Sequence, residues 1–317
     1  MYKILVIISF ASLLSGQSKQ DYVWLFGYDS NLNESGVEST IVDFSQKGKF
    51  EGSRNLTDLW FIGNNTSICD KDGNLLFYSN GCHVANGDHA IIENGNDINY
   101  GDFIIQYRQD TCEHYPAVED ILLLPDPARP HLGFYLIHKR IELDVLLNFM
   151  SLRFSYIDGA ANGGKGILST KSEPILSETE VMYSYLTAVP HINGKDWWIL
   201  QPDYEENIHV VLLNESGFTQ TSIFKVPSNF VLSTSGSGIS KFSPDGSRYA
   251  FYNAYDNLHL FDFDRESGEL HSHQFLRVQP VPDNLAFFSA IEWSSDSRFL
   301  YISRIEELWQ LDTWKMI

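Results

Sequence analysis

The side chains in this sequence that could carry out chemistry are few and scattered. His271 and His273 are two residues apart, a spacing that places both imidazoles on one face of a strand, and imidazole is a common transition-metal ligand. Two ligands without a third make a weak site, so exposed histidines are the preferred interpretation. The sequence contains no Walker loop, His-Glu-x-x-His or Gly-x-Ser-x-Gly pattern. We therefore predict no metal site and no cofactor, and we leave the catalytic residues unassigned.

Two other motifs are similar to known sites and are interpreted as turns. Asp70, Asp72 and Asn74 alternate as calcium-loop ligands do, but the glutamate that completes an EF-hand loop is absent and Gly73 comes too early. Residues 243–246, Ser-Pro-Asp-Gly, are similar to a sialidase Asp box, but that motif needs a residue between Asp and Gly. Both segments fit tight turns between strands, because Asp and Gly tolerate the backbone of such turns.

The three cysteines allow several disulfide pairings. Cys82 and Cys112 flank a polar loop and could form a disulfide in an oxidising compartment, whereas Cys69 falls in a strand pattern and is expected to be buried. Pairing of Cys69 with Cys82 across a hairpin is an alternative, as are three free thiols. The spacing lacks C-x-x-C, which argues against a zinc or redox site.

Trp197 and Trp198 are the candidate rim or ligand aromatics. Neighbouring strand residues point to opposite faces of a sheet. One of the two indoles is therefore expected in the core between two sheets, the blades of the fold predicted below, and the other could reach the rim of that fold or a neighbouring sheet. An indole stacked on a sugar face, with Asp and Asn as hydrogen-bond partners, would make a carbohydrate site. Trp24, Trp60 and Trp293 are interpreted as packing residues.

Repeated hairpins are the elements that must position these side chains. Each of three segments consists of a strand-like stretch, a tight polar turn and a second, aromatic strand-like stretch. These segments are residues 69–78, 242–251 and 293–301. The second and third begin at a spacing close to the ~40–50 residues of sheet-blade repeats. The pattern predicts an all-β fold, a β-propeller of four-stranded antiparallel blades with about five to six blades present.

Strand-like alternation dominates the rest of the chain. A period of two recurs, as in residues 258–263, and no helical period is sustained. Residues 142–150 are the only segment for which a short helical turn is expected. Residues 85–116, rich in Gly, Asn and Asp, are expected to form an extended irregular loop on one rim.

Composition and charge exclude some functions. Aromatic residues make up 14% of the 317 residues, which suits a half-buried pleated surface. The formal net charge of −19 argues against nucleic acid, because phosphate binding needs clustered Lys and Arg. The same excess of negative charge disfavours docking on a membrane surface of anionic lipid.

Residues 1–16 have the features of a secretory signal peptide. A short basic start is followed by the apolar run 4–14 and by small residues that suit cleavage near Gly16. The run is too short to span a bilayer, which needs about 20 apolar residues. We expect export without membrane insertion after cleavage, and residues 17–317 as one β-propeller domain.

Several short segments, taken in their order along the chain, make the sequence recognisable. Together they resemble the secreted WD40-like β-propeller proteins of Bacteroidota, over nearly the whole of residues 17–317. The segments are WLFGY at 24–28, ICDKDGNLLFYSNG at 68–81, LLLP at 122–125, FYLIH at 134–138, NGKDWW at 193–198, FSPDG at 242–246 and LFDF at 260–263. The resemblance implies a type IX secretion cargo that is secreted or displayed on the outer-membrane surface. It implies no reaction, because no catalytic residues are established for these uncharacterised proteins.

The end of the sequence departs from the family pattern. The family continues through further blades to a C-terminal sorting domain, whereas this sequence stops at Ile317, directly after a predicted strand. A sheet edge left there would forgo the ring closure by which propellers protect their edges. We therefore expect a propeller that is truncated at its C-terminus.

Two functions of different class remain open. The first is a non-enzymatic binding or surface-display module, in which rim loops such as 85–116 present polar and aromatic groups to an unidentified protein or carbohydrate partner. The second is a propeller hydrolase of lactonase type, in which carboxylates and Asn hold a divalent cation in the central channel. The sequence marks no such set of ligands, so the binding module is preferred.

Overall fold

The computed structural model describes most of the chain between residues 19 and 315. The described ranges are 19–27, 40–44, 59–61, 64–107, 112–113, 115–116, 120–143, 148–176, 179–227, 238–253, 257–278, 289–304 and 307–315. The predicted signal peptide, residues 1–16, lies outside the described residues.

Six antiparallel sheets, each built from strands that follow one another along the chain, form the described part of the molecule. The first pairs β1 (Val23–Phe26) with β2 (Thr40–Asp43), and the second contains β3 (Thr66–Cys69), β4 (Leu75–Ser79) and β5 (Val84–Asn86). The third contains β6 (Ile121–Pro125), β7 (Gly133–Leu143), β8 (Asn148–Asp158) and β9 (Ile167–Pro174). The fourth contains β10 (Thr187–Pro190), β11 (Trp197–Pro202), β12 (Asn207–Asn214) and β13 (Gly217–Lys225). The fifth contains β14 (Ile239–Phe242), β15 (Arg248–Asn253), β16 (Asn257–Phe263) and β17 (Leu270–Leu276), and the sixth β18 (Ser289–Trp293), β19 (Phe299–Arg304) and β20 (Glu307–Asp312).

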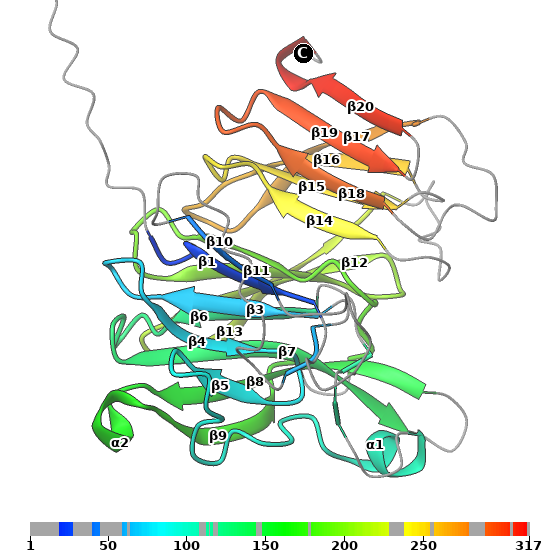
Figure 1. Ribbon diagram of the computed structural model, residues 1–317. Helices are drawn as coiled ribbons and strands as arrows, with labels where there is room; N and C mark the ends of the chain where they lie inside the picture. Colours follow the sequence, from blue (N-terminus) through cyan, green and yellow to red (C-terminus); the bar gives the residue numbers. More distant parts are fainter. Residues whose placement is uncertain are drawn as a thin grey trace, which may run out of the picture.

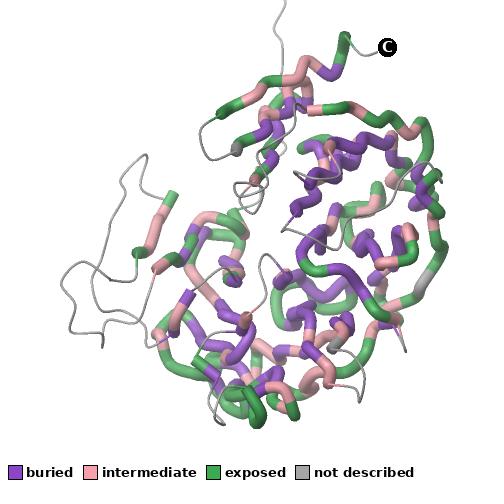
Figure 2. The backbone as a smooth tube through the Cα atoms, turned by 90° about the vertical axis from the view of Figure 1, so that its right-hand side faces the viewer, coloured by how far each residue is buried: buried purple, intermediate pink, exposed green. Residues whose placement is uncertain are grey.

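The sheets are arranged as the blades of a β-propeller. Figure 1 shows them fanned from β8 and β9 at the bottom to β20 at the top, and Figure 2 shows the backbone following a curved path. The first strands of successive sheets lie beside one another, since β1 contacts β3, β3 contacts β6, β10 contacts β14, and β14 contacts β18. The predicted all-β propeller fold is confirmed. None of the six sheets closes on itself in the described part of the chain.

Hydrophobic clusters fill the spaces between successive sheets. Alternation along a strand sends neighbouring side chains to opposite sheets, because successive residues point to opposite faces. On β16, Leu260 packs in the cluster shared with the β18–β20 sheet, whereas Phe261 packs in the cluster shared with the β10–β13 sheet. Burial of one such side chain contributes about 1.5–3 kcal/mol. The stack of blades is therefore held together by apolar contacts that inner sheets make on both faces.

Short polar side chains close the turns at one rim of the propeller, which we call the hairpin rim. In the β14–β15 turn the hydroxyl of Ser243 donates to Asp245 Oδ1 at 2.6 Å, and in the β18–β19 turn Ser294 donates to Asp296 Oδ1 at the same distance. A carboxylate that accepts hydrogen bonds inside its own turn favours the turn over other conformations. The segment similar to an Asp box is thus a hairpin turn.

The segment similar to a calcium loop is also a turn. Asp70 Oδ1 accepts hydrogen bonds from the main-chain N–H groups of Asp72 and Asn74 at 2.8 and 2.9 Å. The Asn74 side chain donates to the other carboxylate oxygen of Asp70 at 2.9 Å. Both oxygens of Asp70 are used by the β3–β4 turn itself, so the carboxylate acts as a turn residue.

Two expectations about connections were wrong. The described ends of residues 142–150 belong to the long strands β7 and β8, which pair along their whole length, so no helical turn begins or ends there. Residues 85–116 are not irregular throughout, because they contain β5, an antiparallel bridge between Ala85 and Ile91, and the helix α1 (Asp102–Tyr107). A helix of one to two turns is too short to produce a sustained period in the sequence.

The other helical segments of the described chain are short. They are α2 (Ala161–Gly164), which lies between β8 and β9, and the 3₁₀ turn η2 (Thr313–Lys315). Within the described ranges, no helix has the length and apolar character needed to cross a membrane.

Candidate ligand-binding site

Residues 95–107, 112–113 and 115–116, which we call the rim segment, lie against the β4–β5 turn at the rim opposite the β3–β4 turn. A disulfide joins Cys82 in the β4–β5 turn to Cys112 in the rim segment, with the two Cα atoms 5.6 Å apart. The ring Nε2–H of His83 donates to the carbonyl of Cys112 at 2.8 Å. The rim segment is therefore tied to this turn by a covalent bond and by a hydrogen bond.

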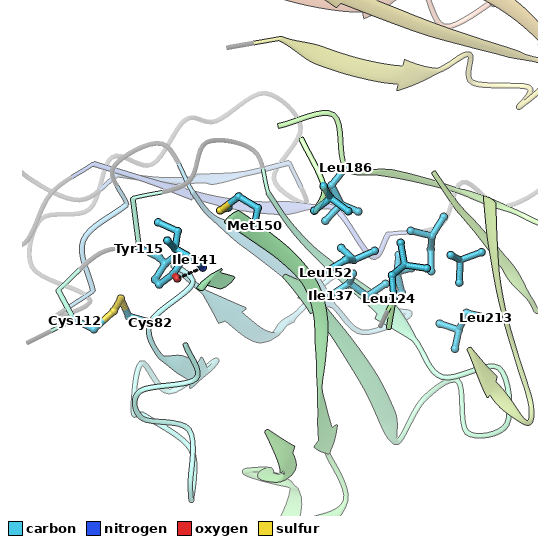
Figure 3. Packing of buried hydrophobic residues seen from close by; sticks show 14 of the residues in the cluster. Cys82, Cys112, Tyr115, Leu124, Ile137, Ile141, Met150, Leu152, Leu186 and Leu213 are labelled. Carbon is cyan, nitrogen blue, oxygen red and sulfur yellow. Dashed lines mark hydrogen bonds between the residues drawn. A yellow bond between two sulfur atoms is a disulfide. The ribbon is translucent and has the colours of Figure 1, made fainter. Parts of the chain in front are cut away.

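Buried hydrogen bonds fix the same segment to β7. The side chain of Asn99 donates to the carbonyls of Gly81 and Lys139 at 3.0 and 3.1 Å. The hydroxyl of Tyr115 accepts a hydrogen bond from the main-chain N–H of Ile141 at 2.7 Å. Figure 3 shows this bond beside the disulfide, both within the hydrophobic cluster between the β6–β9 and β10–β13 sheets. The rim segment is thus anchored in the core at several points.

Exposed apolar side chains lie on this anchored backbone. In α1, Ile104 is completely buried, whereas Ile105 and Tyr107 are 50% and 55% exposed. Tyr100, just before the helix, is also exposed. Exposed large apolar side chains on an anchored segment are a feature of many binding surfaces.

A cavity of about 450 Å³ lies where the first strands of the six sheets meet. The strands β1, β3, β6, β10, β14 and β18 all contribute side chains to its wall. Its volume lies in the range of about 300–1,000 Å³ that small-molecule sites occupy. We call it the central cavity.

A larger cavity of about 710 Å³ opens at the hairpin rim. Its wall includes Asp70, whose carboxylate is used by its own turn, and Lys71, which pairs with Asp72 at 2.8 Å. The charged groups of this turn are engaged with one another, so this cavity is a weaker candidate than the central one.

A buried ion pair lies behind the wall of the central cavity. Lys139 Nζ donates to Asp120 Oδ1 and to the carbonyls of Met182 and Ser184, and both charged side chains are wholly buried. Asp120 Oδ2 accepts from the main-chain N–H of Ser184 at 3.0 Å. An ammonium group has three donors and no acceptor, and all three donors are used here. Lys139 therefore clamps residues 182–184 and is not a free nucleophile.

The buried pair of Lys139 and Asp120, which we call the clamp, holds residues 182–185 in a backbone conformation that is unfavourable by itself. Ser184 and Tyr185 have φ angles of 61° and 65°, which costs residues other than glycine about 1–3 kcal/mol each. Tyr185 lines the central cavity. Burial lowers the pKa of Lys139 and raises that of Asp120, and the attraction between the two charges opposes both shifts. The ion pair thus fixes part of the cavity wall.

Asp203 and His209 form a second buried polar pair. The ring Nε2–H of His209 donates to Asp203 Oδ2 at 2.8 Å, an arrangement that orients the base in some hydrolases. The other oxygen of Asp203 accepts from the main-chain N–H groups of Glu205 and Asn207 at 2.8 and 3.0 Å. The pair therefore holds the β11–β12 turn.

The acid dependence of stability tests the role of Asp203. Burial alone would raise its pKa, but hydrogen bonds from His209, Asn207 and Glu205 outweigh burial and lower the pKa to about 2. Because this value is below the unfolded value of about 3.9, the carboxylate stabilises the fold by about 2 kcal/mol above pH 4. That contribution is lost as the pH falls through about 4 to about 2.

We expect Asp203→Asn to be less stable than wild type at pH 7 and to approach wild type at pH 2. Urea unfolding of both proteins at several pH values measures the difference. A difference in unfolding free energy that is the same at pH 7 and pH 2 would contradict this role for the carboxylate.

The structure joins Cys82 to Cys112, one of the pairings that the sequence left open, and Cys69 is a buried free thiol. Burial raises the pKa of Cys69 to about 11. The thiolate, which is the reactive form, is therefore scarce at neutral pH.

Trp197 and Trp198 both pack between sheets. Trp198 is only 3% exposed, and its indole N–H donates to the carbonyl of Arg265 at 2.8 Å. Trp197 is half-buried against the cluster between the β6–β9 and β10–β13 sheets. Trp198 is therefore the indole of the pair that was expected in the core between blades, and its covered ring is not available to a ligand. The role of Trp197 as a ligand aromatic stays a prediction.

His271 and His273 do not share a site. His273 instead forms a hydrogen bond with the buried His259 on β16, with 2.9 Å between His273 Nε2 and His259 Nδ1. His271 is exposed, and Ser272 between them has a φ of 53°, which breaks the strand alternation.

Sequence reasoning missed the side chains that the structure exposes. Trp24 was interpreted as a packing residue, yet it is 45% exposed at the central cavity, and Phe26 is exposed beside it. The strand VWLF is apolar at every position, so its sequence holds no signal for which face is outward. Nothing in residues 100–107 marks Ile104 as buried and Ile105 as exposed either.

Comparisons with known proteins assign the chain to no family. No protein-family model matches the sequence, and no curated protein matches it. Among solved structures, a protein from Lactobacillus plantarum has a TM-score of 0.43 at 14% identity, over 90% of this chain and 75% of the other. A candidate 6-phosphogluconolactonase from Bacteroides uniformis has a TM-score of 0.40 at 11% identity, over 88% of each chain. The β-propeller domain of Cps50 (Swd1) from Myceliophteria thermophila has a TM-score of 0.42 at 12% identity, over 87% of this chain and 77% of the other. At these values the likenesses carry no argument about function.

Proposed function

We propose that this protein is an exported, non-enzymatic β-propeller that binds a protein or glycan ligand through the rim segment. The observation that carries the proposal is the anchoring of the described rim segment through Asn99, Cys112 and Tyr115, combined with the exposure of the side chains Tyr100, Ile105 and Tyr107. A segment that is already ordered loses little conformational entropy when it binds. Exposed apolar side chains on such a segment therefore favour association with a partner.

The disulfide supports the export part of the proposal. A Cys82–Cys112 bond persists in an oxidising compartment and is rare in the cytosol. The signal-peptide features of residues 1–16 and the resemblance to secreted WD40-like propellers of Bacteroidota support the same location. We extend the proposal to display on the outer-membrane surface or release by type IX secretion.

The hydrolase alternative gains no support from the described geometry. Within the described ranges, no group of three His, Cys, Asp or Glu side chains lies close enough together to hold a metal ion. The buried pair Asp203–His209 is used by a turn, and the buried pair Asp120–Lys139 is used by a clamp. We prefer the binding module because exposed apolar side chains lie on the anchored rim segment.

A binding screen with matched variants tests the proposal. The full 317-residue chain is expressed in a bacterial host, and the exported product is expected to begin near residue 17. It is then screened on a glycan array and against a panel of purified extracellular proteins. We expect at least one ligand to bind wild type and to lose most of its signal with the double variant Ile105→Ser/Tyr107→Ser.

The matched control is Ile192→Ser, which changes an exposed isoleucine in the β10–β11 turn at the hairpin rim. We expect this variant to bind as wild type does. Retention of every signal by the double variant would refute the rim segment as the binding surface. A melting temperature that rises with calcium, manganese or zinc and falls with a chelator would instead favour the hydrolase, since a metal that binds only the native state stabilises it.

A further inference from the structure

One wall of the central cavity is aromatic. In β1, Val23 and Leu25 are buried in the cluster shared with β3 and β4, so Trp24 and Phe26 point to the opposite face, toward the cavity. The ring of Phe44 lies edge-on to the indole of Trp24, with the ring centroids 5.2 Å apart. The main-chain N–H of Phe44 donates to the carbonyl of Tyr22 at 2.8 Å, which fixes the position of this supporting ring. The indole of Trp24 is thus exposed to the cavity and held in place by the ring of Phe44.

Polar groups from other sheets form the rest of the wall. Ser67 on β3, which is half-buried, donates its hydroxyl proton to the main-chain carbonyl of Val23, so its hydroxyl oxygen keeps lone pairs that can accept a hydrogen bond. Lys241 and Glu292 are both partly exposed at the cavity, with 3.8 Å between Lys241 Nζ and Glu292 Oε2. At this separation each charged group can also form a hydrogen bond with a ligand. The cavity therefore offers both donors and acceptors opposite an aromatic face.

These features match the chemistry of a neutral sugar. A pyranose ring has a C–H face that packs on an aromatic ring and hydroxyl groups that both donate and accept hydrogen bonds. Among the residues that the structure describes, the charged ones that line the cavity are Asp21, Lys241 and Glu292, in a chain whose net charge is −19. This balance disfavours a polyanion, because an anionic ligand would meet more negative than positive charge.

We propose that the central cavity is a binding site for a neutral oligosaccharide, with one pyranose ring stacked on Trp24 and its hydroxyl groups bonded to Lys241, Glu292 and the hydroxyl of Ser67. This inference rests on the proposed function, because it names the ligand class of the binding module and adds a second site to it. The rim segment and the central cavity are built from different residues, so variants can separate them.

Titration with defined sugars tests this site. Laminarihexaose, cellohexaose, xylohexaose, maltohexaose and mannohexaose are each titrated into the full chain and followed by calorimetry and tryptophan fluorescence. We expect at least one of the five to bind, and Trp24→Ala to weaken that binding by at least about tenfold. Glu292→Gln, which changes an exposed side chain and leaves Trp24 intact, is expected to weaken it as well.

The matched control is Trp314→Ala, which removes another exposed indole, 56% exposed in η2 and outside the cavity wall. We expect this variant to bind sugar as wild type does, while near-ultraviolet circular dichroism shows that both tryptophan variants are folded. The inference is overturned if none of the five sugars binds, or if Trp24→Ala and Glu292→Gln bind as wild type does. If Ile105→Ser/Tyr107→Ser loses a ligand that Trp24→Ala retains, the proposed function stands and the cavity inference fails.

Discussion

Replacing Lys139 by methionine is expected to lower the free energy of unfolding by about 3–5 kcal/mol, because it leaves the carboxylate of Asp120 buried without a counter-charge. The carbonyls of Met182 and Ser184 would lose a donor at the same time. Residues 182–185 would then lose the clamp that holds the two left-handed residues at the wall of the central cavity. Urea unfolding of the variant and of wild type at pH 7 measures the loss.

Two further variants make this test specific. The double variant Asp120→Leu/Lys139→Met removes both charges and is expected to be more stable than Lys139→Met alone, since no charge is then left unpaired. Lys71→Met removes one partner of an exposed pair at the hairpin rim and is expected to shift the unfolding midpoint little. A Lys139→Met protein as stable as wild type would show that the pair does not hold this part of the fold.

Removal of the Cys82–Cys112 disulfide is expected to lower the free energy of unfolding by about 3–4 kcal/mol. The bond closes a loop between residues 30 positions apart, and the stabilisation arises mainly because the closed loop restricts the unfolded chain. The variant Cys82→Ser/Cys112→Ser, and wild type treated with a reductant, are expected to lose the same amount in urea unfolding. The double variant is also expected to bind rim-segment ligands more weakly, because α1 loses its covalent anchor.

Peptide mapping provides the control for this prediction. Without reductant, exported wild type is expected to yield one linked pair of peptides, containing Cys82 and Cys112, and a free thiol at Cys69. The reductant is expected to leave the stability of Cys82→Ser/Cys112→Ser unchanged, because no other disulfide is expected. Recovery of Cys82 as a free thiol from the exported protein would refute the pairing.

The propeller fold was predictable from the sequence because its signals are local. A tight turn depends on a few adjacent residues, and the serine and aspartate pairs at 243–245 and 294–296 form the same hydrogen bond in two blades. Alternation with a period of two then indicates strands on both sides of each turn. Residues 142–143 and 148–150 were misassigned because their local sequence does not show the pairing of β7 with β8 that places them in strands.

The candidate site depends on contacts between residues that are far apart in the chain. The rim segment is held by bonds to the β4–β5 turn and to β7, and the wall of the central cavity is formed by strands from all six sheets. Neither the exposure of Trp24 nor the burial of Trp198 follows from the strand that contains it. Trp198 packs in the cluster shared with the β14–β17 sheet, whereas Trp24 lies at the central cavity.

The sequence by itself therefore determined the hairpins, the strand alternation and the class of fold, since these follow from short-range backbone and side-chain preferences. Only the tertiary structure decided which aromatic rings are exposed, which cysteines pair and where Lys139 finds its partners, because long-range packing alone brings those atoms together.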